Sequence, residues 1–100
     1  MKTKEEIEIE FSKAYAQAQS IEEVANTLIG LANTISTKDM TYFEKAWKGE
    51  NAMLLGMKGR DLSERIFGAA QDLVKVSESI RFSADLIYKA EKSAAMLAYR

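Results

Sequence analysis

The side chains that could do chemistry in this chain are carboxylates, lysines, serines and tyrosines. The sequence contains no histidine and no cysteine, which removes the commonest general base, the commonest metal ligand and every thiol nucleophile. Neither a Ser-His-Asp triad nor the Glu-x-x-His pairs of a di-iron bundle can be assembled. The acidic pairs Glu22-Glu23 and Asp61/Glu64 are typical of solvated helix surfaces and helix starts. We therefore expect no catalysis, no metal and no cofactor.

The charges and glycines do not form a phosphate-binding feature. The chain has 14 basic and 15 acidic residues, and neither sign collects in a long block. Nucleic-acid binding needs a basic stripe, so we expect no nucleic-acid partner. The stretch LLGMKGRD (54–61) contains glycines, but no Gly-Lys-Ser/Thr follows, as a phosphate-cradling loop would require.

The beginning of the sequence does not have the pattern of a Sec signal peptide. In MKTKEEIEIEF (1–11), glutamates interrupt the apolar residues, whereas a signal needs an uninterrupted apolar core. No apolar run in the sequence approaches the roughly 20 residues that span a bilayer. We expect neither a signal peptide nor membrane insertion, so any export would use another route.

The elements that position these side chains are predicted to be helices. The composition is 47% apolar and 29% charged, with no proline and five glycines, so the turn residues that many short strands need are missing. Alanine, leucine, glutamate and lysine favour long helices. The expected fold class is all-α, and 100 residues correspond to a single domain, 1–100.

The first helix is predicted over about residues 11–36. Thr3-Lys4-Glu5-Glu6 matches a capping box that would begin the helix early, but residues 7–11 alternate with a period of two, which favours an extended arm. We therefore place the secure start near residue 11. The apolar residues that form a heptad stripe are Phe11, Ala14, Ala18, Ile21, Ala25, Leu28, Ala32 and Ile35.

The second helix is predicted over about residues 51–98, after a bend at about 37–50. In the bend, Trp47 ends a short helical piece as an apolar plug, and Gly49 suits the left-handed position just past a helix end. The simplest architecture is an antiparallel helical hairpin. The second helix continues one heptad stripe, formed by Ala52, Leu55, Gly59, Leu62, Ile66, Ala69, Leu73, Val76, Ile80, Ser83, Ile87, Ala90, Ala94 and Leu97.

The predicted arms are unequal, which leaves apolar surface uncovered. About 26 residues of the first helix span roughly 40 Å and nearly 50 of the second roughly 70 Å, so the end of the second helix should overhang. A second stripe on this helix faces sideways from the first and consists of Phe67, Ala70, Val74, Ala84 and Tyr88.

This surplus surface predicts association with another helical chain. A lone two-helix hairpin buries little surface per residue, and packing onto a second hairpin would give a four-helix bundle. The alternative is that the second helix breaks and folds over into a three-helix monomer. The predicted partner interface consists of Val24, Leu31, Phe67, Ala70, Val74, Ile80 and Ile87.

Trp47-Lys48-Gly49, placed between two heptad arms in a chain of 100 residues, resembles the WXG (ESAT-like or Esx-like) family of type VII secretion systems. The resemblance covers the whole chain as architecture but three residues as a literal motif. It implies a bacterial helical hairpin that forms homodimers or heterodimers and is exported folded. Such proteins are secreted substrates or export partners of larger toxins with a helical N-terminal domain. The resemblance implies that Trp47 packs at the tip of the hairpin and that Gly49 permits the reversal of the chain.

The family's export signal, Tyr-x-x-x-Asp/Glu after the second helix, is present here only in degenerate form. Tyr88 is followed by Glu91 at +3, and Lys92 occupies +4. Both spacings lie on the face of the tyrosine, although ordinary surface positions are an equal alternative. The departure favours a protein that travels with a partner carrying or completing the signal. The resemblance thus implies a protein that binds the type VII machinery and is cytoplasmic before export and secreted afterwards.

Two functions outside secretion remain open. One is a cytosolic structural or adaptor helical hairpin. The other is a carboxylate-based helical-bundle enzyme, which would need a convergent polar pocket.

Overall fold

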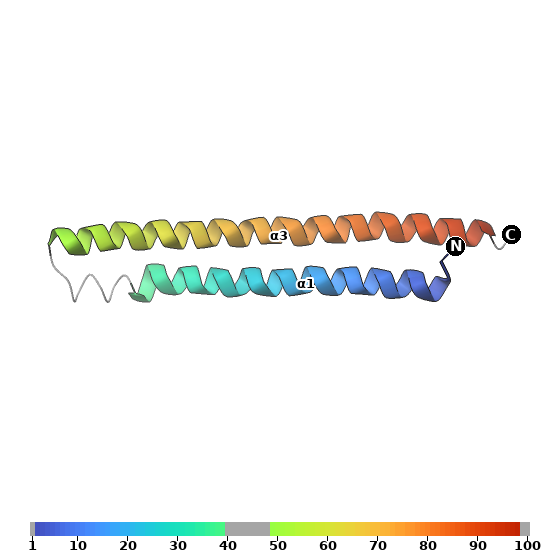
Figure 1. Ribbon diagram of the computed structural model, residues 1–100, viewed down its shortest axis with the longest axis horizontal. Coiled ribbons are helices and arrows are strands. Elements are labelled where there is room, and N and C mark those ends of the chain that lie inside the picture. The colour runs from blue at the N-terminus through green and yellow to red at the C-terminus, as the bar shows by residue number, and fades with distance from the viewer. Residues whose placement is uncertain (1, 40–48, 99–100) are drawn as a thin grey trace. The chain divides into compact units, whose positions relative to one another are not determined.

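The computed structural model describes residues 2–39 and 49–98. In chain order its elements are α1 (Lys4–Thr34), a π-helical turn η1 (Ile35–Asp39) and α3 (Glu50–Ala98) (Figure 1). The described residues contain no strand, so the all-α prediction is confirmed.

The first helix begins at Lys4 because Thr3 caps it. The Glu6 amide donates a hydrogen bond of 3.1 Å to Thr3 Oγ1, and the Ile7 amide donates one of 3.1 Å to the Thr3 carbonyl. Glu5 and Glu6 lie in the first turn, where the helix dipole favours negative charge. The predicted start near residue 11, with an extended arm before it, is therefore wrong, and the capping-box alternative describes this end of the helix.

The end of α1 widens into the π-helical turn η1. The hydroxyls of Ser36 and Thr37 both donate to the Asn33 carbonyl, at 3.2 and 2.6 Å, and Thr34 donates to the Gly30 carbonyl at 2.9 Å. Serine and threonine hydroxyls bond in this way to carbonyls one turn earlier in a helix. Helical structure thus continues to Asp39, beyond the predicted end at residue 36.

The second helix begins directly after Gly49. Gly49 has a φ of 96°, a conformation that glycine adopts readily and other residues rarely do. The Met53 amide donates a bond of 3.2 Å to the Gly49 carbonyl, which opens the first turn of α3. The start at Glu50 lies one residue before the predicted one. Trp47 and the rest of residues 40–48 lie outside the described residues.

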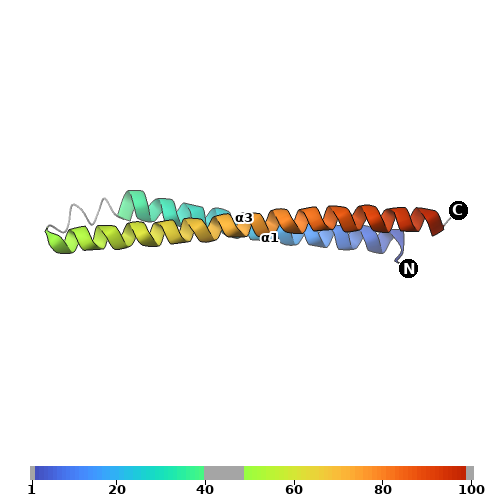
Figure 2. The same cartoon turned by 90° about the horizontal axis from the view of Figure 1, so that it is seen from above.

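Two compact units divide the chain, and each contains part of both helices. Unit 1 is Met1–Glu22 with Val74–Arg100, and unit 2 is Glu23–Leu73. In unit 1 the blue part of α1 lies beside the orange and red part of α3, and the two run antiparallel (Figures 1 and 2). In unit 2 the Ser63 hydroxyl of α3 donates a bond of 3.2 Å to the Ala32 carbonyl of α1. The antiparallel helical hairpin is therefore confirmed.

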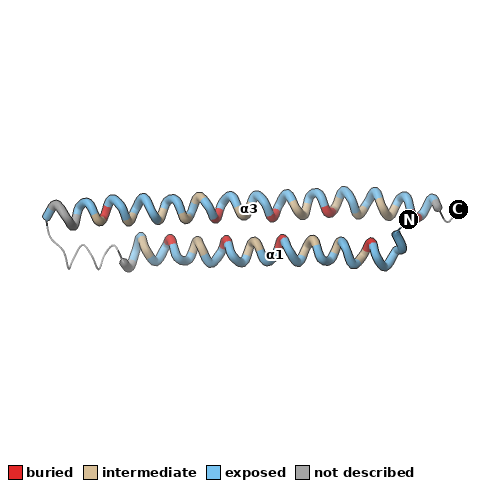
Figure 3. Tube along the Cα trace, viewed as in Figure 1, coloured by how far each residue is buried: buried red, intermediate tan, exposed pale blue. Residues whose placement is uncertain are grey.

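The buried positions of α1 and α3, red in Figure 3, lie mainly where the two helices face each other, and most of them carry small side chains. Every residue of the stripe predicted on α1 is buried or half-buried, so that prediction is confirmed. Its fully covered positions, Ala18, Ala25 and Ala32, recur every seven residues. The buried positions that recur in the same way on α3 are Ala70, Ser77 and Ala84.

The stripe predicted at the centre of the seam on α3 lies at its edge instead. Leu55, Ile66, Leu73 and Ile80 are half-buried, whereas its other large members Leu62, Val76, Ile87 and Leu97 are 50%, 46%, 55% and 64% exposed. The buried column lies one position later in the sequence, because small residues on both helices allow their backbones to approach closely. A prediction weighted by hydrophobicity follows the large side chains and so misses this column. Ala70 and Ala84, predicted to face sideways, belong to the seam.

The predicted overhang of the second helix is also wrong as far as Lys92. Because α1 begins at Lys4, its first turns reach the end of α3 in unit 1. Lys2 contacts Glu91, and Glu8 contacts Lys92.

Candidate partner interface

A ladder of polar side chains closes one side of the helix pair in unit 1. Glu8, Tyr15 and Glu22 recur every seven residues on α1, and at 3.6 residues per turn they form one column. We call this set, with its partners on α3, the polar ladder. The partners are Ser77, Arg81, Asp85, Tyr88 and Lys92.

The inner rungs of the ladder connect charge to aromatic ring. Arg81 forms an ion pair with Glu22. The buried Ser77 hydroxyl donates to the Val74 carbonyl at 2.7 Å and lies 3.3 Å from the same Glu22 carboxylate. The Arg81 guanidinium lies 5.8 Å from the centre of the Tyr15 ring, a distance at which the ring attracts a cation. The Tyr15 hydroxyl donates to Asp85 Oδ1 at 2.6 Å. Each of these ladder side chains thus contacts the opposite helix.

The outer rung is built around Glu8. The Tyr88 hydroxyl donates to Glu8 Oε1 at 2.6 Å, and Lys92 Nζ lies 2.9 Å from the same oxygen. Phe11 packs between two tyrosines, with ring centres 4.6 Å from Tyr15 and 4.4 Å from Tyr88. The tilted geometry is one that aromatic pairs favour, so the ladder has an apolar filling between its polar rungs.

Contacts within the ladder shift the pKa values of its members in the directions expected for paired groups. The Tyr88 hydrogen bond, helped by Lys92, lowers the pKa of Glu8, and the Arg81 bond lowers the pKa of Glu22. The bond to Asp85 raises the pKa of Tyr15. All three groups are therefore held in the protonation state that they have at neutral pH.

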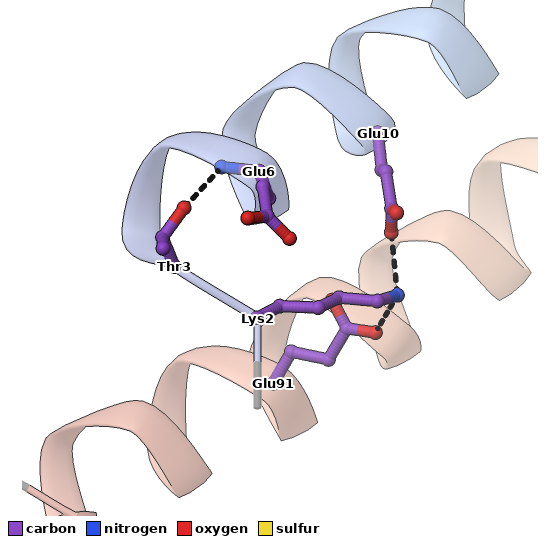
Figure 4. A network of polar contacts seen from close by, with 5 residues as sticks. All are labelled: Lys2, Thr3, Glu6, Glu10 and Glu91. Carbon is purple, nitrogen blue, oxygen red and sulfur yellow. Dashed lines mark hydrogen bonds and ion pairs between the residues drawn. The ribbon is translucent and has the colours of Figure 1, made fainter.

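Lys2 ties the start of the chain to the end of α3 (Figure 4). Its Nζ donates to Glu10 Oε2 at 2.5 Å and to Glu91 Oε1 at 2.7 Å. These two carboxylates, Glu10 foremost, raise the pKa of Lys2. The bridge joins the first residues to a position 89 residues later in the sequence.

An apolar groove lies on the other side of the seam in unit 1. The angular position of its α3 residues, at 3.6 residues per turn, is opposite to that of the ladder residues. We define the apolar groove by its lining residues, which are Ala14 of α1 and Lys75, Val76, Ser79, Ile80, Ser83, Ala84 and Ile87 of α3.

The outer wall of this groove continues along α3 without a charged residue. Steps of three and four lead from the groove to the end of the helix, and every member after Ile80 is exposed. We call this column the uncharged face. It consists of Val76, Ile80, Ser83, Ile87, Ala90, Ala94 and Leu97.

The residues predicted for the partner interface do not share one side of the hairpin. Ile80 and Ile87 belong to the uncharged face, and Ile87 is exposed while Ile80 is half-buried. Phe67 and Val74 instead occupy the heptad column of Arg81 on α3, where Phe67 is exposed and Val74 half-buried. Ala70 is fully buried and has no surface left to offer a partner.

Val24 and Leu31 are the predicted interface residues on the first helix. Both are exposed on α1 in unit 2, and their spacing of seven places them in one column. They remain available to a partner.

The two positions of the degenerate export motif are both engaged within unit 1. Tyr88 is half-buried, bonded to Glu8 and packed on Phe11. Glu91 accepts the bond from Lys2. The bend motif is described in part, since Gly49 is exposed with a positive φ and Trp47 lies outside the described residues.

Reasoning from the sequence missed the ladder because it treated isolated charges as solvated. Glu22, predicted as part of a solvated pair, contacts Arg81 and Ser77. The signal that could have revealed the ladder is the spacing of Glu8, Tyr15 and Glu22 directly beside the apolar stripe. Asp61, in contrast, pairs at 3.1 Å with Arg65 on the exposed surface of its own helix.

In the described part of the chain, neither metal-binding or membrane-spanning features nor similarity to known proteins points to a further site. Among residues 2–39 and 49–98, no group of three or more acidic side chains could hold a metal ion, and no helix is long and apolar enough to cross a bilayer. No protein family, curated protein or solved structure matches this chain.

Proposed function

We propose that this protein is a small type VII secretion-associated hairpin that acts by binding another helical chain and catalyses no reaction. It is either a secreted substrate or an export partner of a larger toxin. The observation that carries the binding role is the uncharged face of α3 beside the apolar groove. The motif Trp47-Lys48-Gly49 between two long helices supports the assignment to secretion.

The amount of exposed surface supports a bound partner. The chain exposes 7617 Å², whereas a folded monomer of 11.2 kDa exposes about 5,700 Å². The surplus of about 1,900 Å² lies in the range of roughly 1,000–2,500 Å² that each subunit buries in a permanent dimer. A second hairpin, from another copy, a sister protein or a toxin domain, would cover it in a four-helix bundle.

Co-expression with the neighbouring genes tests this function. The expected result is co-purification with a second helical protein or a helical toxin domain, or a stable homodimer. Export should depend on an FtsK-like secretion ATPase, and the protein should appear outside the cell without cleavage. A chain that stays monomeric with every neighbour, and whose location ignores the ATPase, would overturn the proposal.

The second candidate is a cytosolic adaptor hairpin. It is favoured by the contacts of Tyr88 with Glu8 and of Glu91 with Lys2, which occupy the two residues of the degenerate export motif. This candidate predicts the same groove-mediated binding but a cytoplasmic location that does not change when the ATPase is deleted.

A further inference from the structure

Over much of its length, the seam between α1 and α3 repeats so regularly that its apolar side chains do not by themselves define one register. From Ala18 to Ile35 on α1, small residues alternate with large ones and each type recurs every seven residues, whereas Phe11 and Ala14 depart from the pattern. Within the regular stretch, sliding one helix by seven residues, about 10 Å, would again place small residues near small ones and large near large. Swaps that conserve volume in this way cost a packed seam little. The repeating columns on α3 are Ser63, Ala70, Ser77 and Ala84, and Ile66, Leu73, Ile80 and Ile87.

The polar ladder, in contrast, does not repeat. Glu22 faces Ser77 and Arg81 in the observed register. A slide of seven residues in one direction would replace them with Ala84 and Tyr88, and in the other direction with Ala70 and Val74. Both slides lose the ion pair of Glu22. Next to Ala70 and Val74 its carboxylate would face only apolar side chains, which is unfavourable, and next to Ala84 and Tyr88 only the tyrosine hydroxyl could replace the lost partners.

The outer rungs discriminate mainly against one direction. The Tyr15 hydroxyl donates to Asp85; one slide would bring it to Lys92 and the other to Glu78, which could accept the same bond. Glu8 would leave Lys92 and Tyr88, and the first slide would offer it no cation, whereas the second would bring it to Arg81 but leave Glu22 without one. The observed register is thus the one in which all three α1 members of the ladder find their partners.

We infer that the polar ladder is a register lock, which selects one alignment of two helices whose apolar seam accepts several. The lock also positions the apolar groove, because Ala14 comes from α1 and the rest of the lining from α3. The register inference stands on these contacts and does not depend on the proposed function.

Distances between two spin labels test the lock. The chain has no cysteine, so labelled cysteines introduced at Lys13 and Ser93, both exposed in unit 1, report on α1 and α3. The parent should give one narrow distance. The variant Glu8→Gln/Tyr15→Phe/Glu22→Gln should add a second population, displaced along the helix by about 10 Å. A single distance equal to that of the parent would overturn the inference.

A matched control removes the same number of side-chain groups elsewhere. Glu5, Glu23 and Glu64 are exposed and lie outside the ladder, so Glu5→Gln/Glu23→Gln/Glu64→Gln should keep the single distance. A second population in this control as well would mean that general charge, rather than the ladder, sets the register, and would contradict the inference.

A charge exchange decides the matter even if the triple ladder variant loses helicity. Glu22→Arg and Arg81→Glu each place like charges across the seam and should each populate a second distance. The double exchange restores an ion pair and should return the single parental distance. Single exchanges that keep the parental distance, or a double exchange that fails to restore it, would overturn the lock.

Discussion

The two sides of the helix pair in unit 1 differ in how their side chains are engaged. On the ladder side, Glu8, Tyr15 and Glu22 all find partners on the opposite helix. On the groove side, Val76 and Ile87 have apolar side chains that remain exposed. Polar groups that are paired within the chain offer a partner little, whereas an exposed apolar column gains by being covered. One side closes the hairpin, and the exposed apolar column of the other is the surface that we propose for binding.

The largest expected effect comes from placing a charge on the groove side. Ile87→Glu would put a carboxylate into an apolar interface without a counter-charge, which is costly. We expect partner affinity to fall by about 30-fold or more, the effect of an interface hot spot, with helicity unchanged in circular dichroism. The control Lys89→Glu changes an exposed residue of the same turn outside the uncharged face. Equal losses from both variants would show that the groove side has no special role.

On the ladder side, Phe11→Ala should mainly affect the hairpin itself. Phe11 is half-buried and packs on Tyr15 and Tyr88. Its loss should lower the free energy of unfolding by about 2–3 kcal/mol, somewhat less than for a fully buried phenylalanine. Urea denaturation measures the change. A loss below about 0.5 kcal/mol would mean that the aromatic filling does not hold the two helices together.

Between the two sides, the seam predicts a third effect. Ala18 is fully buried, so Ala18→Leu should force the helices apart and cost about 1–3 kcal/mol. Val76→Ala, on the exposed column, should change the unfolding free energy by at most about 0.5 kcal/mol, measured at a concentration where no partner binds. If Val76→Ala cost more unfolding free energy than Ala18→Leu, the seam on α3 would run through Val76 and not through Ser77.

The smallest expected effect is a dependence on pH that belongs to the ladder alone. The pKa values of Glu8 and Glu22 lie below their usual 4.5 in the folded chain. The stabilisation they give is therefore complete above pH 4.5 and is lost as the pH falls through the lowered folded-state values. Tm should decrease modestly on acidification, and Glu8→Gln/Glu22→Gln should reduce this decrease. If Tm of the double variant fell with pH as it does in the parent, Glu8 and Glu22 would not be the cause of the acid dependence.

The helices and the α1 side of the seam could be predicted because they follow from spacing and composition. Phe11 to Ile35 alternates steps of three and four without interruption, and a packed helix needs this pattern. The seam on α3 could not be found in the same way. Ser77 is polar and Ala70 and Ala84 are small, so they score below Val76 and Leu62, although small side chains are what close helix packing requires.

The start of α1 and the ladder depend on contacts that a periodic pattern does not contain. Thr3 begins the helix by accepting a hydrogen bond from the Glu6 amide. This cap outweighs the alternating apolar and polar pattern of residues 7–11, which favours an extended chain. Glu22 and Arg81 are 59 residues apart in the sequence, and only the antiparallel pairing brings them together. Of the residues predicted for the partner interface, Ile87 is exposed and Ala70 is buried, because the close approach of the helices covers the small side chain.

The mass of the purified particle tests the division between a closed side and a binding side most directly. Light scattering on the full chain, alone and co-expressed with each neighbouring gene, should give a particle heavier than the single chain of 11.2 kDa in at least one case. Ile87→Glu should return that particle to the single-chain mass with its helicity intact. A wild-type chain that measures 11.2 kDa in every combination, or an Ile87→Glu particle of unchanged mass, would contradict the account.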